Sequence, residues 1–290
     1  MKKLTALLLL LSLLAFPPCM AENDRVIASF YPVYLFTQNI LDGTGIPVSC
    51  MTAPTTGCLH DYQLLTSDMR TLSSARAFVI CGAGMEGFLD AVTAQLPNLP
   101  VIDSSTGIAL IREGAEDEME FNAHIWLAPQ NAIIMVENIA SALAELYPDH
   151  AEQIRQNADN YAARLAALDA ELAQALEDLP RRDIVTFHAA FPYFAQAYGL
   201  HVAAVVTTEP DEPISPKALA EVIATVREYD NPPLFAEPLY TDAALSAVQA
   251  ETGAPVYYLD PITSGDDAPD RYETAMRENA ATLMQALRER

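Results

Sequence analysis

Three of the five histidines and two carboxylates stand at the ends of predicted strands or just ahead of a predicted helix. They are His60, His124, His188, Glu237 and Asp260. Ligand sites in open α/β sheets form outside the carboxyl ends of the strands. Side chains in these positions are therefore placed to meet in one crevice.

Three neutral imidazoles and one carboxylate make the four-coordinate shell of nitrogen and oxygen that zinc takes in proteins. We expect His60, His124, His188 and Asp260 to supply this shell, with Glu237 as a reserve nearby. The sequence offers neither a thiolate cluster nor the oxygen-rich shell that Mg²⁺ or Ca²⁺ requires. The four ligands are 64, 64 and 72 residues apart, which matches no local metal motif.

Each of these residues also has a structural alternative. His60 or His188 could be a hydrogen-bonded structural histidine, and Asp260, which precedes a proline, could cap a turn. His150, near a helix start, and His201, inside a predicted strand, are interpreted as structural. Trp126, the only tryptophan, is expected in the core.

Short β-type runs alternate with helical stretches in both halves of the chain, which predicts parallel sheets covered by helices. The predicted strands are 25–30, 47–53, 77–81, 99–103, 183–187, 201–206, 233–237 and 255–260. Helices are predicted at 217–229 and 241–252, among others. The fold class is α/β with two lobes.

A long helix is predicted in the middle of the chain. Its apolar residues recur at alternating four- and three-residue steps, from Ile154 to Leu179. A coiled coil has a similar period, but the flanking strand–helix units favour a single rigid helix that joins the two lobes. The predicted boundaries are 22–148 for the N-terminal lobe, 149–179 for the helix and 180–290 for the C-terminal lobe.

The first 21 residues have the layout of a secretory signal peptide: two lysines, an apolar run and Ala21 at the cleavage site. Acylation at Cys19 is the alternative, and either reading exports the protein. Without Lys2 and Lys3, 14 basic residues face 39 acidic ones, which gives a net charge of −25. This charge excludes nucleic acid and anionic membranes as partners.

Cys50, Cys58 and Cys81 remain after cleavage. An odd number of cysteines in an oxidising compartment predicts at most one disulfide, with Cys58 paired to either of the others. The stretch 112–120, REGAEDEME, reads as a solvated acidic loop.

Several segments, taken in order, resemble the zinc/manganese-type periplasmic solute-binding proteins of metal ABC importers. The first is RVIASFYPVYLFTQNI (25–40). The others are HDYQLLTSD (60–68), HIWLAPQNA (124–132), HAAFPYFAQAYGL (188–200), EPISPKALAEV (212–222), FAEPLYT (235–241) and ETGAPVYYLDPI (251–262).

The resemblance implies a monomeric, non-enzymatic receptor that binds a transition-metal ion between two lobes and passes it to a membrane permease. The ligands would match His60, His124, His188 and Asp260. A glutamate often replaces the third histidine in manganese receptors, so His188 favours Zn²⁺. A Mn²⁺ or Fe²⁺ receptor with the same ligands is the first alternative. A zinc hydrolase with Glu237 or Asp61 as its base is the second.

The chain departs from the family pattern at several positions. Asn122 and Ala128 stand where acidic residues are usual, and Ala189 where an aspartate is common, which removes a possible partner for the ligands. The acidic stretch 112–120 lacks the histidines that zinc receptors often carry there. These departures bear on metal affinity more than on the identity of the ligands.

Overall fold

The computed structural model describes residues 24–53, 59, 62–113, 120–207, 214–238 and 243–288. The predicted signal peptide, Cys19, Cys58, His60 and Asp61 lie outside these ranges. Among the helices within them, none combines the length and the apolar character needed to span a bilayer.

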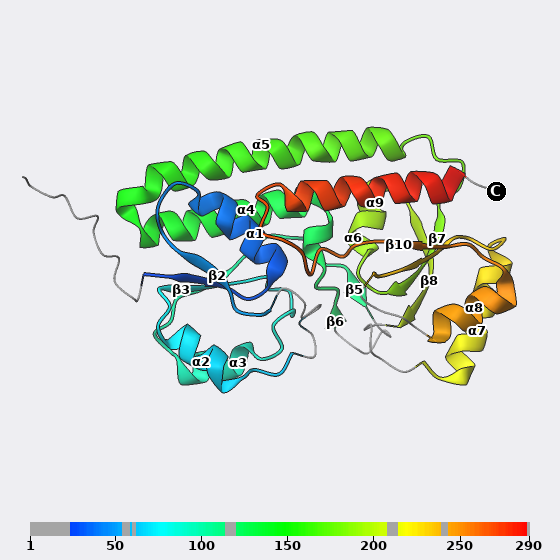
Figure 1. Ribbon diagram of the computed structural model, residues 1–290, viewed down its shortest axis with the longest axis horizontal. Helices are drawn as coiled ribbons and strands as arrows, with labels where there is room; N and C mark the ends of the chain where they lie inside the picture. The colour runs from blue at the N-terminus through cyan, green and yellow to red at the C-terminus, as the bar shows by residue number, and fades with distance from the viewer. Residues whose placement is uncertain are drawn as a thin grey trace, which may run out of the picture.

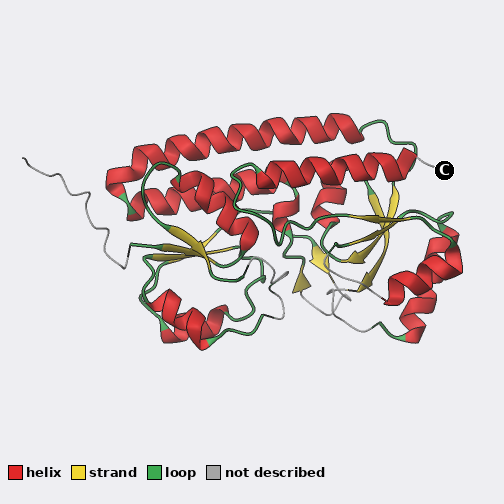
Figure 2. Ribbon diagram, viewed as in Figure 1, coloured by secondary structure: helices red, strands yellow, loops and turns green. Residues whose placement is uncertain are grey.

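The N-terminal lobe is built on a parallel four-stranded sheet in the order β2-β1-β3-β4 (Figure 1). Its strands are β1 (Val26–Ala28), β2 (Val48–Cys50), β3 (Ala77–Ile80) and β4 (Val101–Asp103). Helix α1 (Tyr31–Leu41) covers one face, and α2 (Thr66–Ser73) and α3 (Leu89–Gln95) lie on the other side (Figure 2). The burial of β1 and β3 at every position fits parallel strands covered on both faces.

The C-terminal lobe repeats this plan with a parallel sheet in the order β10-β9-β7-β8. Its strands are β7 (Asp183–His188), β8 (His201–Thr207), β9 (Leu234–Ala236) and β10 (Val256–Tyr258). The helices that follow them include α6 (Pro192–Tyr198), α7 (Pro216–Glu228) and α8 (Ala243–Thr252). All eight predicted strands are present, and the prediction of two α/β lobes is confirmed.

The acidic stretch 112–120 is not a loop throughout. Its ends form a short antiparallel ribbon in which β5 (Arg112–Glu113) pairs with β6 (Glu120–Phe121). The ribbon lies between the two sheets (Figure 1). The acidic composition predicts a solvated loop, but pairing of the backbone at the two ends of the stretch forms the ribbon.

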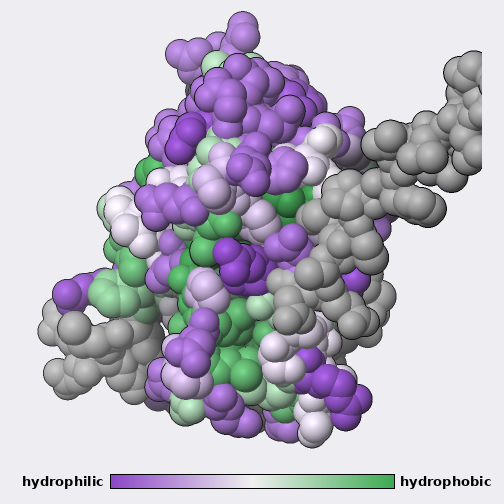
Figure 3. All heavy atoms as spheres, turned by 90° about the vertical axis from the view of Figure 1, so that its left-hand side faces the viewer, coloured by the Kyte–Doolittle hydropathy of each residue, from purple (hydrophilic) through white to green (hydrophobic). Residues whose placement is uncertain are grey.

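Helix α5 (Ala151–Leu176) runs along both lobes and confirms the long connecting helix (Figure 1). A 3₁₀ turn (Pro148–His150) precedes it. It packs against α1 and α4 (Pro129–Leu146) at one end and against α6 and α9 (Arg271–Arg288) at the other. The predicted stripe is buried, except that Leu176 takes the place expected for Ala175. The outward face of the helix is polar, as the hydrophilic top of the molecule in Figure 3 shows.

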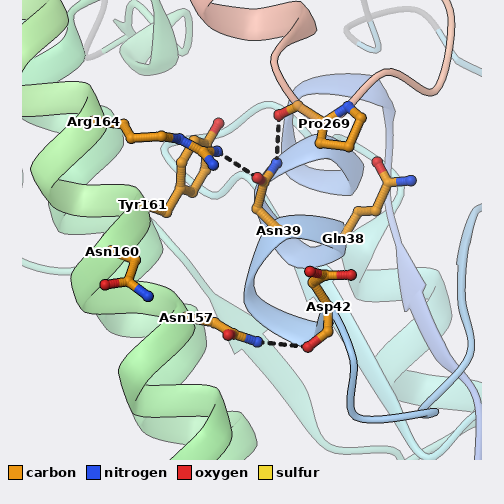
Figure 4. Close-up of a pocket in the computed structure, with 8 residues that line it drawn as sticks. All are labelled: Gln38, Asn39, Asp42, Asn157, Asn160, Tyr161, Arg164 and Pro269. Atoms are coloured by element: carbon orange, nitrogen blue, oxygen red, sulfur yellow. Dashed lines mark hydrogen bonds between the residues drawn. The ribbon is translucent and has the colours of Figure 1, made fainter.

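A polar pocket of about 230 Å³ lies where α1, α5 and the segment before α9 meet (Figure 4). Arg164 on α5 donates to Asn39 on α1 at 2.6 Å and to Glu273 on α9 at 3.0 Å. Asn39 donates to the carbonyl of Pro269 at 2.9 Å. Asn157 donates to two carbonyls at the C-terminal end of α1. The connecting helix is therefore fastened by side chains to both lobes.

Candidate metal centre

The rings of His124 and His188 lie against each other at the junction of the lobes. Their centroids are 4.7 Å apart and their planes are nearly perpendicular, at 81°. Both residues are almost completely buried, with exposed fractions of 1% and 3%. Buried imidazoles so close together would repel each other if both were protonated. Neutral rings in this arrangement are suited to share a metal ion.

His188 is the last residue of β7, and its neighbour strand supplies its partner. Strands β7 and β9 pair in parallel with Thr186 opposite Phe235. The same register brings Glu237, just after β9, beside His188. The Nδ1 atom of His188 is hydrogen-bonded to a carboxylate oxygen of Glu237, and both side chains are buried. Glu237 therefore orients the His188 ring, which is the usual role of a carboxylate behind a metal-binding imidazole.

His124 stands immediately before the 3₁₀ turn Ile125–Leu127 and is oriented by Asn122. The Asn122 side-chain oxygen accepts from the backbone N–H of His124 at 2.9 Å and lies 3.2 Å from its Nδ1 atom. The ring of Trp126 contacts the His124 ring, with centroids 5.2 Å apart. Trp126 is fully buried, as predicted for a core residue.

Hydrogen bonds tie this turn to the C-terminal lobe. The amide of Asn122 donates to the carbonyl of Ala189 at 2.6 Å, next to His188. Trp126 Nε1 donates to the carbonyl of Pro261 at 2.8 Å, next to Asp260. The mutual placement of His124, His188 and the Asp260 segment is thus set by contacts between the lobes.

Asp260 follows β10 by two residues, because the strand ends at Tyr258 and not at Asp260 as predicted. Its Oδ2 atom accepts from Arg271 at 2.5 Å, and its Oδ1 atom accepts from the backbone N–H of Ile262 at 2.7 Å. Glu237 and Asp260 line the same cavity of about 310 Å³.

In the described part of the chain, no three side chains among histidine, cysteine, aspartate and glutamate are gathered closely enough to hold a metal ion. The first predicted ligand, His60, lies outside that part. The structure therefore brings together His124 and His188, orients each, and pairs Asp260 with Arg271. The complete ligand set stays a prediction. Cys58 lies outside the described residues, and Cys50, one of its two predicted disulfide partners, has a free thiol.

Glu86 is a buried carboxylate at the carboxyl edge of the N-terminal sheet. It accepts hydrogen bonds from the Ser29 hydroxyl at 2.7 Å and from the backbone N–H groups of Cys81 and Gly82 at 2.8 and 3.0 Å. Burial is the dominant influence and raises the pKa of Glu86 to about 7, while these hydrogen bonds act in the opposite direction. Glu86 thus joins the segments that follow β1 and β3.

Glu86→Gln is expected to change how stability depends on pH. The folded protein keeps the Glu86 proton up to a pH of about 7, whereas an unfolded glutamate releases it near pH 4.3. Between these pH values the native state binds one proton more than the unfolded state does. The contribution of Glu86 to the free energy of unfolding therefore falls as the pH rises through this window. Between pH 4.5 and 7, the free energy of unfolding of the wild type should therefore fall by roughly 3 kcal/mol relative to that of Glu86→Gln.

Urea denaturation at a series of pH values measures this difference. Glu145→Gln, at an exposed position of α4, is the matched control and should follow the wild type. Parallel curves for wild type and Glu86→Gln would contradict the assignment of a raised pKa.

The residues that orient the histidines have only weak signals in the sequence. Asn122 reads there as a departure from the family pattern, and Glu237 as a reserve ligand. Asn122 contacts His124, two positions along the chain, whereas Glu237 contacts His188, which is 49 positions away. The Asn-x-His spacing is a local signal for the first contact, and parallel pairing of β7 with β9 predicts the second. Arg271 and Glu86 carry no comparable signal in the sequence.

Comparison with known proteins places this geometry in a family. A family model described as "Zinc-uptake complex component A periplasmic" matches residues 26–286. The zinc-binding protein AdcA of Streptococcus pyogenes serotype M1 is 30% identical over 285 residues, covering 89% of this chain and 55% of that protein. The iron-binding protein YfeA of Yersinia pestis is 32% identical over 260 residues, covering 87% and 82%.

The solved structures agree with the sequence matches. A crystal structure of ZnuA has a TM-score of 0.79 at 30% identity and covers 91% of this chain and 98% of that one. The solute-binding protein FpvC of Pseudomonas aeruginosa, in complex with Mn²⁺, has a TM-score of 0.83 at 27% identity with the same coverage. The chain spans about half the length of the AdcA relatives it matches. The family model, in contrast, matches nearly the whole of this chain, which therefore belongs to the ZnuA family of zinc-uptake complex component A proteins.

Proposed function

We propose that the chain is an extracytoplasmic receptor that binds one Zn²⁺ and delivers it to the permease of an ABC importer. The observation that carries the proposal is the buried pair of His124 and His188 at the lobe junction, each ring oriented by a side chain behind it. Buried, preoriented imidazoles are the donors that zinc prefers. Membership of the ZnuA family supports the same function.

His60, His124, His188 and Asp260 are the proposed ligands. His60 would approach from the N-terminal lobe, after β2, and Asp260 from the C-terminal lobe, after β10. A bound ion would then connect both lobes. The proposed lobes are residues 22–148 and 180–290, joined by 149–179, with export through the N-terminal signal and the receptor acting as a monomer.

A receptor for Mn²⁺ or Fe²⁺ is the second candidate. The relatives include an iron-binding protein and a structure in complex with Mn²⁺. Imidazole-rich sites favour zinc over manganese in intrinsic affinity, because zinc stands later in the Irving–Williams order. The two buried imidazoles in contact at the junction therefore support zinc.

Metal analysis of the purified mature protein tests the proposal. We expect about one zinc per chain after dialysis against Zn²⁺, and full retention of it against a hundredfold excess of Mn²⁺. Displacement by Mn²⁺ would support the second candidate. A protein that takes up no transition metal would refute both.

A further inference from the structure

Arg271 is the first residue of α9, and its guanidinium is paired with the carboxylate of Asp260. The Nη2 atom lies 2.5 Å from Oδ2, and the two side chains are only 19% and 22% exposed. A charge-assisted hydrogen bond that is largely shielded from water is stronger than one on the surface. The pair is therefore a defined part of the structure and not a transient surface contact.

The rest of Asp260 is also fixed. Its other carboxylate oxygen accepts from the backbone of Ile262, and its backbone N–H and carbonyl both bond to Asn279, at 2.8 and 2.7 Å. Asn279 and Arg271 both belong to α9. Helix α9 thus determines where the carboxylate points.

Arg271 is enclosed by the loop that leads into α9. A Cβ atom on Gly265 would lie 2.4 Å from the Tyr31 hydroxyl and 3.0 Å from Arg271 Nε, so only glycine fits there. Tyr31 in turn donates to the carbonyl of Asp266 at 2.5 Å, which holds the loop against α1 of the other lobe. The guanidinium is therefore kept beside Asp260.

The pair is connected to the candidate metal centre through a shared cavity. Asp260 and Arg271 line the same cavity as Glu237, which is hydrogen-bonded to His188. Arginine stays charged at any physiological pH. A divalent cation that binds Asp260 must displace the guanidinium from Oδ2 or share the carboxylate with it, at the cost of repulsion between like charges.

We propose that Arg271 is a positioning residue that competes with the metal for the Asp260 carboxylate, which lowers zinc affinity and speeds zinc release. The inference rests on the proposed function. It gives a reason for a fixed positive charge beside a cation site: the receptor has to give up its ion to the next component. The opposite arrangement, with a neutral residue at 271, would hold the ion more tightly.

Arg271→Met and Arg271→Gln test the proposal. Each should lower the Kd for Zn²⁺ about tenfold, in proportion to one charge-assisted hydrogen bond, and slow release to a chelator by a similar factor. Arg271→Lys keeps the positive charge and should stay within about threefold of wild type. Arg277→Met removes an arginine of the same helix that pairs with Glu171 on the surface, and should change nothing.

A double variant tests whether the effect acts through Asp260. In an Asp260→Asn background the competition for the carboxylate is absent and only charge repulsion remains, so Arg271→Met should tighten zinc binding by much less than tenfold. Unchanged or weaker zinc binding in both Arg271→Met and Arg271→Gln, with folded protein by circular dichroism, would overturn the inference. An equally large tightening in the Asp260→Asn background would also overturn it. Failure of the wild type to bind zinc would instead refute the proposed function.

Discussion

His188→Ala is expected to abolish high-affinity zinc binding. The substitution removes one of four proposed ligands, and it also leaves the buried Glu237 carboxylate without the imidazole to which it is hydrogen-bonded. Loss of an outer partner alone costs 10- to 100-fold in metal affinity, so loss of a ligand should cost more than about 100-fold. Chelator competition with the purified protein gives the Kd, and elemental analysis gives the metal content. His124→Ala should behave in the same way, because it also removes a proposed ligand, whose ring contacts that of His188.

His201→Ala is the matched control. His201 lies on β8 of the same sheet, is exposed, and pairs with Asp183 at 2.7 Å. It should keep one zinc per chain with unchanged affinity. Because His188 is buried, thermal unfolding in the presence of a chelator must show that His188→Ala is still folded. A folded His188→Ala variant that keeps its zinc would remove His188 from the ligand set.

The architecture was predictable because its signals are local. Alternation of apolar runs with helical periodicity gave all eight strands of the two main sheets, and the apolar stripe from Ile154 gave the connecting helix. Ends were less certain, since they depend on single hydrogen bonds: α5 stops at Leu176, and β10 stops two residues before Asp260. The ribbon of β5 and β6 was missed because strands of two residues leave no periodicity to detect.

The candidate site was predictable in its ligand types but not in its arrangement. A histidine at a strand end, such as His188, and one just ahead of a helical turn, such as His124, are expected to share a crevice, and the two rings do meet. The pairing of Asp260 with Arg271 could not be foreseen, because the cation comes from α9 and depends on how that helix docks on the sheet. Contacts that form only when separate elements pack together leave no pattern in a single sequence.

The contacts between lobes limit how the protein can open. Tyr272 donates to the carbonyl of Trp126, and Trp126 donates to the carbonyl of Pro261, so each lobe holds the other by buried hydrogen bonds. Arg164 adds a third link through α5. A wide hinge motion would break all of these at once. Movement of individual segments, such as the one that carries Asp260, requires fewer of them to break.

Glu237→Ala is expected to weaken zinc binding roughly 10- to 100-fold without removing a ligand. In the native arrangement the Glu237 carboxylate is hydrogen-bonded to Nδ1 of His188, which fixes the ring and leaves Nε2 as the nitrogen that would bind the metal. Without the carboxylate, the ring can rotate and populate the other tautomer. Glu237→Gln keeps an acceptor of the same size but loses the negative charge, so its loss of affinity should be smaller.

The graded response separates orientation from direct ligation. If Glu237 positions His188, the order of zinc affinity is wild type, then Glu237→Gln, then Glu237→Ala, and the metal content at saturating zinc stays at about one per chain. Glu251→Gln, at an exposed carboxylate of α8 that pairs with Arg227, should match the wild type. If Glu237→Gln instead loses zinc affinity as severely as His188→Ala, the Glu237 carboxylate is itself a metal ligand, which is the alternative role that the sequence suggests for it. Equal affinity in all three proteins would mean that packing alone holds the His188 ring.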